Sequence, residues 1–502
     1  MIPPNDITRA ASVLLTRGPG SPEVFLVHRS EKLRFMGGFV AFPGGKVHRQ
    51  DAALARPAEG LDVRRVCAVR ELFEETGVLL ARTADGSFPA HSDLIEPRRR
   101  LLDDSLTFAD LLRDLKLTLH GADLIDAGSL VTPPFSPVRF DTAFLIAHLP
   151  PGQRAEVWPG ELTAGVWHSA DEALRRWDAG ELLISPPTVT LLETVRGRAI
   201  DELPALLRPL LDRFVAGALH PIWYSPGVLT LPVRCDGLPP ATHTNAYLVG
   251  TDTAWLLDPA ATHDDERAHL FAMIEREGRR GRRLAGIVLT HHHPDHIGAV
   301  AICAERYGVP VLAHEETARL LTGKVRVDRL LVEGDRLDLG VAPHGRGRWH
   351  LEALLTPGHA PGHLVFYEPD YRLLFVGDMV STLSSIVITP PEGDLPQYLA
   401  SLHRLRTLPA RLLLPAHGPA SARVEHTLDE CLAHRAKREE QLLAALGPTP
   451  RTVADLALDL YRGLPSSLMP LAELQTLAGL DKLRREGRVA TGDAGWVLTR
   501  PS

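Results

Sequence analysis

A run of ligand-type side chains at residues 290–296 constrains this chain more than any other feature. Its sequence is Thr-His-His-His-Pro-Asp-His, and it follows an apolar stretch, Leu284 to Leu289, that predicts a buried strand. Four imidazoles and a carboxylate make a poor hydrophobic core, whereas neutral imidazole and carboxylate oxygen are good ligands for zinc and similar divalent ions. The segment therefore indicates a metal site, with a solvated histidine-rich turn as the simpler alternative.

Three later segments supply the same kinds of ligand. His359 lies in a Pro/Gly turn at residues 356–363, and Asp378 and His417 each follow a short apolar run. In this order the four segments resemble the metallo-β-lactamase superfamily, over roughly residues 226–425. The resemblance implies one metal ion held by His291, His293 and His359, a second held by Asp295, His296 and His417, and Asp378 as a bridge between the two.

The same resemblance gives Asp295 a catalytic part. Thr290 and His363 are candidates for orienting the imidazoles, and His363 is also a possible ligand. Two cations that share a water lower its pKa to about 7 and stabilise the oxyanion that forms when the water attacks. We therefore expect two transition-metal ions, zinc first, and hydrolysis of an acyl or phosphoryl centre.

Composition sets wider limits. The 502 residues predict about two to four domains. A net charge of −7 argues against a large nucleic-acid surface, though not against a local basic patch. The four cysteines lie far apart, which favours free thiols in a reducing cytoplasm. With no secretory signal and no apolar run near the ~20 residues of a membrane span, we expect a cytoplasmic protein without a membrane partner. The sequence does not predict an oligomeric state.

A second acidic motif lies at Arg70–Val78. On a helix, Glu71, Glu74 and Glu75 stand at i, i+3 and i+4, so the three carboxylates share one face, and Gly77 would end the helix. Clustered like charges destabilise a helix unless cations neutralise them, and hard oxygen ligands favour Mg²⁺ or Mn²⁺. A solvated acidic face is the alternative.

Arg70–Val78 resembles the second half of the Nudix box. Gly45 and Asp51 would be the glycine and acid of the first half, but Asp51 to Arg70 is 19 positions, about eleven more than usual. This expansion and the segments around residues 132–142 and 185–188 look like the peroxisomal Nudix branch that acts on coenzyme A derivatives. The resemblance implies cleavage of a diphosphate bond in a small nucleotide or coenzyme A derivative, with Mg²⁺ or Mn²⁺. It implies that Glu71 and Glu75 are the principal metal ligands and that Glu74 assists them. Arg70 would orient these glutamates, and Glu161 is a candidate for a late metal ligand or base. The altered spacing leaves a non-catalytic binding module as the alternative.

The tail resembles the winged-helix end of the β-lactamase-like-2 group, whose animal members cut single-stranded RNA. That resemblance makes a phosphodiester the first hypothesis for the metallo-β-lactamase-like part. Phosphate contacts would come from four basic residues, which are equally compatible with a solvated helix face: Lys482, Arg484, Arg485 and Arg488.

The competing hypothesis is an acyl-thioester hydrolase similar to the glyoxalase II branch, which shares the aspartate bridge. A thioesterase beside a coenzyme A diphosphatase would be chemically coherent. Antibiotic hydrolysis is disfavoured, because the β-lactamases most similar to this pattern have a cysteine at the position of Asp378. Only 39 positions separate Asp378 from His417, which leaves no room for the inserted domain of the nucleic-acid-processing relatives.

These inferences predict a multidomain chain of α/β and α+β classes. We expect a Nudix α/β/α sandwich at residues 1–205, a linker at 206–226, an αββα metallo-β-lactamase sandwich at 227–425 and a small winged-helix domain at 426–502.

Overall fold

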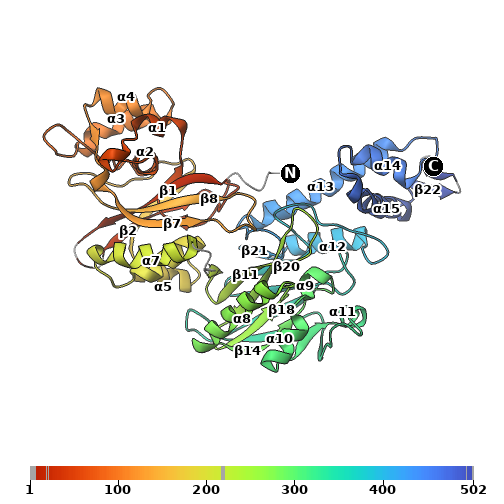
Figure 1. The fold of residues 1–502 in the computed structure, drawn as a ribbon. Helices are drawn as coiled ribbons and strands as arrows, with labels where there is room; N and C mark the ends of the chain where they lie inside the picture. Colours follow the sequence, from red (N-terminus) through yellow and green to blue (C-terminus); the bar gives the residue numbers. More distant parts are fainter. Residues whose placement is uncertain (1–6, 19, 21, 216–220, 493, 500–502) are drawn as a thin grey trace. The chain divides into compact units, whose positions relative to one another are not determined.

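A computed structural model describes residues 7–18, 20, 22–215, 221–492 and 494–499 (Figure 1). Its contacts divide the chain into two compact units, Met1–Leu229 and Thr230–Ser502. Both units contain helices and sheets, as the sequence predicts. None of the helices in the described ranges is both long and apolar enough to cross a membrane.

The N-terminal unit is built on a mixed sheet. The sheet follows the order β3-β2-β1-β8-β7, with β4 paired to β1 and β9 paired to β2. β1 lies parallel to β8 and antiparallel to β2. Its strands are β1 (Thr8–Arg17), β2 (Glu23–Arg29), β3 (Val40–Ala41), β4 (Gly44–Lys46), β7 (Ile125–Val131), β8 (Phe140–His148) and β9 (Leu162–Ser169). A separate pair consists of β5 (Ala81–Arg82) and β6 (Thr118–Leu119).

Helices cover both faces of this sheet. Figure 1 shows α1–α4 on one side and α5 and α7 on the other, which gives the expected three layers. The alternating residues Ala11, Val13 and Leu15 of β1 share one core cluster with Val66 and Phe73 of α2. The helices are α1 (Arg49–Leu54), α2 (Val63–Thr76), α3 (His91–Leu102), α4 (Phe108–Asp114), α5 (Ala170–Asp178), α6 (Pro186–Val195) and α7 (Leu203–Val215), with short 3₁₀ turns η1 (Pro57–Glu59), η2 (Gly121–Asp123) and η3 (Ile200–Glu202).

The expected linker at residues 206–226 is not open chain where the structure describes it. Residues up to Val215 belong to α7, and β10 (Ile222–Ser225) follows. Leu207 and Leu211 of α7 are fully buried, and α7 packs on β7. Residues 206–215 are therefore part of a packed helix and not a linker, because the apolar face of α7 must be covered. The Pro/Gly residues that suggested a boundary lie beyond this helix.

The C-terminal unit contains two large sheets, besides a two-stranded sheet in its tail. One runs through β11 (Val228–Arg234), β12 (His243–Gly250), β13 (Thr253–Leu257), β14 (Arg283–Val288), β15 (Val311–His314) and β16 (Arg329–Leu331), and is parallel from β13 to β16. The other has the order β17 (Arg336–Val341), β18 (Arg348–Leu355), β19 (Leu364–Glu368), β20 (Leu373–Gly377) and β21 (Leu412–Pro415).

Helices pack on these sheets and then continue into the tail. α8 (Asp264–Arg279), α10 (Val300–Tyr307) and α11 (Glu315–Leu320) contact the first sheet, and α12 (Leu395–Arg406) and α13 (Val424–Ala445) share a core with the second. The tail contains α14 (Val453–Leu460), η4 (Ser466–Leu468), α15 (Met469–Arg485) and a hairpin of β22 (Val489–Gly492) and β23 (Gly495–Leu498). Leu456, Leu483 and Trp496 join these elements in one small core.

Candidate active sites

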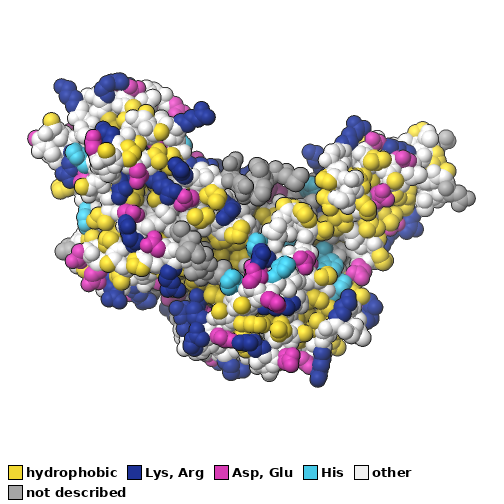
Figure 2. Space-filling view, in the orientation of Figure 1, with side chains coloured by type: hydrophobic (Ala, Val, Ile, Leu, Met, Phe, Trp, Pro, Cys, Tyr) yellow, Lys and Arg dark blue, Asp and Glu magenta, His cyan; other side chains and the backbone are white. Residues whose placement is uncertain are grey.

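The ligand-type residues of the C-terminal unit follow the ends of its strands. His291 and His293 come after β14, and the single-turn helix α9 (Pro294–Ile297) carries Asp295 and His296. His359 follows β18, while Asp378 and His417 follow β20 and β21. Figure 2 shows histidine side chains gathered on the exposed face of this unit. Segments far apart in the sequence therefore meet at one place.

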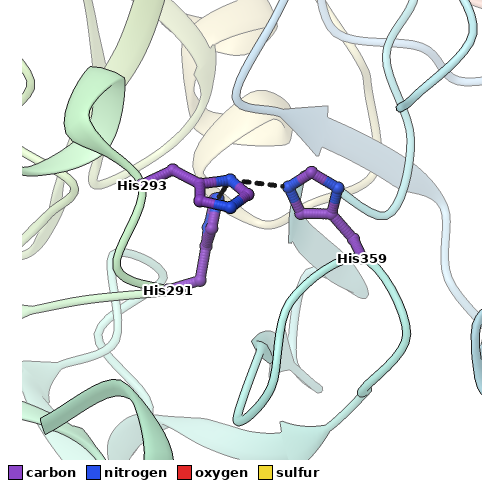
Figure 3. A group of neighbouring side chains, drawn as sticks. All are labelled: His291, His293 and His359. Carbon is purple, nitrogen blue, oxygen red and sulfur yellow. Dashed lines mark hydrogen bonds between the residues drawn. The ribbon is translucent and has the colours of Figure 1, made fainter. Parts of the chain in front are cut away.

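Three imidazoles form the first group of the site (Figure 3). The Nδ1 atom of His293 lies 2.9 Å from Nε2 of His291 and 3.0 Å from Nε2 of His359. Burial lowers the pKa of all three groups, that of His293 to about 3. Three neutral ring nitrogens that point at one another are an arrangement that a cation can stabilise, and they form one candidate metal-binding group.

A second group lies beside the first, and Asp378 faces both. Oδ1 of Asp378 is 3.5 Å from Nε2 of His296 and 3.4 Å from Nε2 of His417. Oδ2 of the same carboxylate is 3.5 Å from Nε2 of His359. Asp295 completes the second group, with Oδ2 3.5 Å from His417. The two oxygens of Asp378 thus point to different groups, as a bridging ligand requires.

Charge in this second group is balanced between imidazoles and carboxylates. Burial alone would lower the pKa of His417, but Asp378 and Asp295 raise it to about 10. Asp378 and Asp258 raise the pKa of His296 well above its usual value despite burial, and His417 and His296 hold the pKa of Asp378 well below its usual range. The buried atoms Nε2 of His296 and Oδ1 of Asp378 have no hydrogen-bond partner among the described residues. The donor set therefore fits a bound divalent cation, which would displace the protons.

The imidazoles are held from behind by oxygen atoms. Four of them turn Nε2 toward the centre and place Nδ1 against an oxygen: His291 against Thr290 Oγ1 at 3.0 Å, His296 against Asp258 Oδ2 at 2.9 Å, His359 against the Val387 carbonyl at 2.8 Å and His417 against the His243 carbonyl at 3.0 Å. His293 is reversed, since its Nδ1 faces the centre. Such partners fix the tautomer and the orientation of a ligating imidazole.

Asp258 is a positioning residue that sequence reasoning did not assign. Its carboxylate accepts hydrogen bonds from the Thr290 backbone at 2.8 Å and the Thr290 hydroxyl at 2.6 Å, besides contacting His296. Its φ of 43° places it in the left-handed region directly after β13. The signal in the sequence was an aspartate before Pro259, at the end of an apolar run.

His363 orients the site and does not face its centre. Its Nε2 accepts the Asp378 backbone N–H at 3.1 Å, and its Nδ1 lies 3.0 Å from Thr356 Oγ1. Both ring nitrogens are therefore occupied, which removes the possibility that His363 is a further ligand in this arrangement. Of its two expected roles, the structure favours orienting.

In the N-terminal unit, Arg70 organises the acidic motif on α2. Its Nε and Nη2 atoms donate to the two oxygens of Asp51 at 2.7 and 3.1 Å, and both side chains are completely buried. Its Nη1 donates to Glu71 at 2.9 Å and to Glu74 at 3.0 Å. Burial opposes the charge on Arg70, but Asp51 and the two glutamates hold its pKa above the ordinary range. Asp51 therefore takes the expected acid position despite the expanded spacing.

The inserted residues form their own local structure. Asp51 lies in α1 and accepts the His48 backbone N–H at 2.7 Å, and η1 and the turn at Gly60 lead back to α2. Gly45 lies against Glu71, so that a Cβ there would be 2.4 Å from the Glu71 carboxyl carbon. The insertion thus loops out between the two halves of the motif and leaves the glycine, the acid and the helix together.

The glutamates of α2 are poised to bind cations. Burial raises the pKa of Glu71, of Glu74 to about 7 and of Glu75 to about 8. Glu75 accepts the Gly44 backbone N–H at 2.8 Å. The exposed Glu161 is one of the charges that raise the pKa of Glu75, so it lies close enough to remain a candidate for the same site.

The basic residues expected to contact phosphate are all paired within the tail and its neighbours. Arg485 donates to Asp394 at 2.6 Å, and Arg484 donates to Asp481 at 3.2 Å. Lys482 donates to Glu439 at 2.5 Å and Glu486 at 2.7 Å, and Arg488 also pairs with Glu439. These cations are therefore paired in the described structure, with Glu439 on α13, with Asp394 just before α12 and with Asp481 and Glu486 of the tail itself, and their contact with phosphate stays a prediction.

Comparison with known proteins supports this division of the chain. Residues 239–417 match the metallo-beta-lactamase superfamily model. A probable metallo-hydrolase, YqgX, of Bacillus subtilis is 32% identical over 186 residues, which cover 35% of this chain and 85% of that protein. The chain belongs to the metallo-β-lactamase superfamily. It also carries a Nudix domain, matched by the NUDIX domain model at residues 6–105 and the NUDT19 Nudix domain model at 58–195. The beta-lactamase associated winged helix domain model matches residues 452–496.

Two further relatives resemble the metallo-β-lactamase domain. A beta-lactamase-like protein 2 homolog of Caenorhabditis elegans is 26% identical over 253 residues, 49% of this chain and 80% of that protein. A hydroxyacylglutathione hydrolase of Rhizobium meliloti is 34% identical over 131 residues, 26% of this chain, and the match spans 46% of that relative's length. The metallo-β-lactamase and Nudix families are families of metal-dependent hydrolases, so this chain is a metal-dependent hydrolase.

Proposed function

We propose that the metallo-β-lactamase domain is a hydrolase with a binuclear centre. His291, His293 and His359 would hold one ion, Asp295, His296 and His417 the other, and Asp378 would bridge them. The observation that carries this proposal is the Asp378 carboxylate, whose Oδ1 and Oδ2 face different groups of ligands. The imidazole and carboxylate donors favour zinc or a similar transition metal.

The residues of the site divide the work of hydrolysis. When bound, two divalent cations lower the pKa of water and stabilise the negative charge that develops during attack. In the cation-free site His417 and His296 keep the pKa of Asp295 below its usual value despite burial, and as a ligand of the second ion its carboxylate would orient the attacking water. Asp258, Thr290 and His363 fix the orientation of the surrounding groups.

For the substrate of this domain we propose an acyl thioester. The four basic side chains of the tail are paired with carboxylates, which leaves them poorly suited to bind a polyanion. The similarity to a hydroxyacylglutathione hydrolase supports this substrate, and so does the sequence resemblance of the Nudix domain, matched by the NUDT19 model, to enzymes that act on coenzyme A derivatives.

The second candidate is hydrolysis of a phosphodiester in single-stranded RNA. The winged-helix match and the similarity to a beta-lactamase-like protein 2 homolog favour it. The two candidates are separated by kcat/KM on an acyl-coenzyme A and on single-stranded RNA at increasing salt. RNA cleavage that falls steeply with salt, and whose slope flattens in a triple alanine variant of Lys482, Arg484 and Arg488, would favour the phosphodiester. Thioester cleavage with little change in that variant would favour the thioester.

For the Nudix domain we propose Mg²⁺- or Mn²⁺-dependent cleavage of a diphosphate bond in a coenzyme A derivative. The completely buried Asp51–Arg70 pair carries this proposal, because it restores the geometry of the motif across the insertion. Glu71 and Glu75 would supply most ligand oxygens, and Glu74 or Glu161 could accept a proton from the attacking water. Incubation with coenzyme A and Mg²⁺ should yield two phosphate-bearing products. Their absence, with the domain folded, would favour a binding module.

A further inference from the structure

An irregular segment between β20 and α12 connects the tail helices with the metal centre. This segment, residues 386–394, is named the strap below. It contains no regular helix or strand, and it lies between two sets of contacts within the C-terminal unit.

On one side the strap touches two ligand residues of the metal centre, His359 and His293, and their chain neighbours Gly358 and His292. The Val387 carbonyl contacts Nδ1 of His359 at 2.8 Å, and the Asp394 backbone N–H donates to the carbonyl of the preceding Gly358 at 2.8 Å. Oε2 of Glu392 lies 3.0 Å from Nε2 of His292 and 4.0 Å from Nε2 of His293. Glu392 is thus the carboxylate behind His293, whose Nδ1 faces the centre.

On the other side the tail helices hold the strap. Arg435 of α13 and Gln475 of α15 both donate to the Ile386 carbonyl, the latter at 3.4 Å. Arg485 of α15 donates to the Asp394 carboxylate at 2.6 Å. Ile388 is fully buried in the core shared by the second sheet and α12. The Ile386 end of the strap is therefore fastened to α13 and α15, and the Asp394 end to α15.

We propose that Glu392 is a positioning residue for the metal ligand His293, and that α13 and α15 hold Glu392 and Val387 in place through the strap. This inference rests on the proposed binuclear function. The other four imidazoles each have an oxygen within 3.0 Å of the ring nitrogen that faces away from the centre, and the carboxylate on that side of His293 is Glu392, at the longer distance of 4.0 Å. Its position beside His292 aims one carboxylate oxygen at both rings. The tail then contributes to the affinity for metal without contacting an ion.

The test compares metal affinity in four variants of the full chain. Dissociation constants for Zn²⁺ come from competition with a chromophoric chelator, and the visible spectrum of the Co²⁺-loaded protein reports ligand geometry. Glu392→Ala should weaken one of the two sites about 10–100-fold and alter the spectrum. Glu392→Gln keeps an acceptor oxygen and should lose less. Arg485→Ala should weaken the same site by about fivefold, as the loss of one partly exposed ion pair suggests.

Arg484→Ala is the matched control, because Arg484 lies on the same helix and pairs only with Asp481 in the described contacts. It should leave both constants within about twofold of the unmodified protein, as expected for a surface substitution. Unchanged affinity and spectrum in Glu392→Ala would overturn the positioning role. An effect of Glu392→Ala without one of Arg485→Ala would overturn the part assigned to α15. If the unmodified protein binds a third Zn²⁺ and Glu392→Ala loses it, Glu392 is a metal ligand and the positioning role is overturned.

The stoichiometry of the unmodified protein separates this inference from the function beneath it. Two bound ions together with normal affinity in Glu392→Ala would overturn only the inference. Fewer than two ions in the unmodified protein would overturn the binuclear function, and the inference with it.

Discussion

Each imidazole of the metal centre has one ring nitrogen facing inward and the other facing an oxygen or a carboxylate. This arrangement fixes which nitrogen is free to bind, because the outward contact selects the tautomer. Asp378 is the residue on which both halves of the centre depend. Its carboxylate is buried, and it faces His296 and His417 through one oxygen and His359 through the other.

Asp378→Asn should therefore lose bound metal and activity together. Asparagine keeps the volume of the side chain but cannot offer two anionic oxygens. We expect the metal content to fall from two ions to one or fewer, and kcat/KM to fall by more than about 100-fold, since changes behind a ligand already cost 10–100-fold. Elemental analysis and hydrolysis assays measure both quantities. Asp370→Asn, at an exposed turn after β19, should change neither. Full activity in metal-depleted protein would contradict the mechanism.

The glutamates of α2 make a prediction about pH. In the cation-free protein, burial raises the pKa of Glu74 to about 7 and that of Glu75 to about 8, so both are largely protonated at pH 6. A cation must displace these protons, and its apparent affinity should increase as the pH rises through 7 and 8, by up to about tenfold per pH unit for each proton displaced. Calorimetric titration with Mg²⁺ at pH 6 to 9 measures this dependence.

At the scale of elements, the buried pair between α1 and α2 joins the two halves of the Nudix motif. Asp51 and Arg70 are fully buried, and Arg70 also reaches the Lys46 carbonyl at 2.9 Å, so three elements meet at one guanidinium. Removal of one partner would leave the other charge buried and uncompensated.

Asp51→Ala should consequently destabilise the N-terminal unit by about 3–5 kcal/mol, the usual cost of breaking a buried ion pair. It should also lower Nudix activity, because Glu71 and Glu74 lose a fixed Arg70. Denaturant unfolding, followed through the intrinsic fluorescence of the N-terminal unit, gives the free energy of unfolding of that unit. Glu59→Ala removes an exposed partner of Arg56 in the same insertion and should have little effect. Equal stability of the two variants would show that Asp51 does not organise the motif.

The candidate ligands could be picked out from the sequence because most of them lie within one short segment next to a strand or along a helix. Glu71, Glu74 and Glu75 share a helix, and His291 to His296 form one turn. What could not be predicted depends on contacts between distant segments. Asp258 was not assigned because a single carboxylate after a strand has no local pattern, and the pairing of the tail cations was not predicted because Glu439 and Asp394 are distant in sequence.

At the scale of the whole molecule, two sets of ligands lie in separate compact units. Glu71, Glu74 and Glu75 belong to the first unit, and the residues between His291 and His417 belong to the second. No described residue serves in both candidate sites. The two reactions should therefore be separable by mutation.

Glu75→Gln should remove diphosphate cleavage and leave hydrolysis by the metallo-β-lactamase domain unchanged. His291→Ala should do the reverse, because each substitution removes a ligand from only one site. The measurement is kcat/KM of each variant on both substrates, with metal content as a second readout. An equal loss of both activities in either variant would show that the sites are not independent.

Helix α7 also bears on how far the N-terminal module extends along the chain. It contributes none of the candidate catalytic residues and lies beyond the segments matched by the Nudix models, which end at residue 195. Yet Leu207 and Leu211 are fully buried, and Leu211 packs closely against Gly128 of β7. A Cβ added at Gly128 would lie 2.9 Å from the Cβ of Leu211. A chain shortened at residue 205 would expose the apolar surface that α7 covers. A Nudix domain excised from this chain must therefore include α7 to keep that surface covered, so the structural module is longer than the catalytic one.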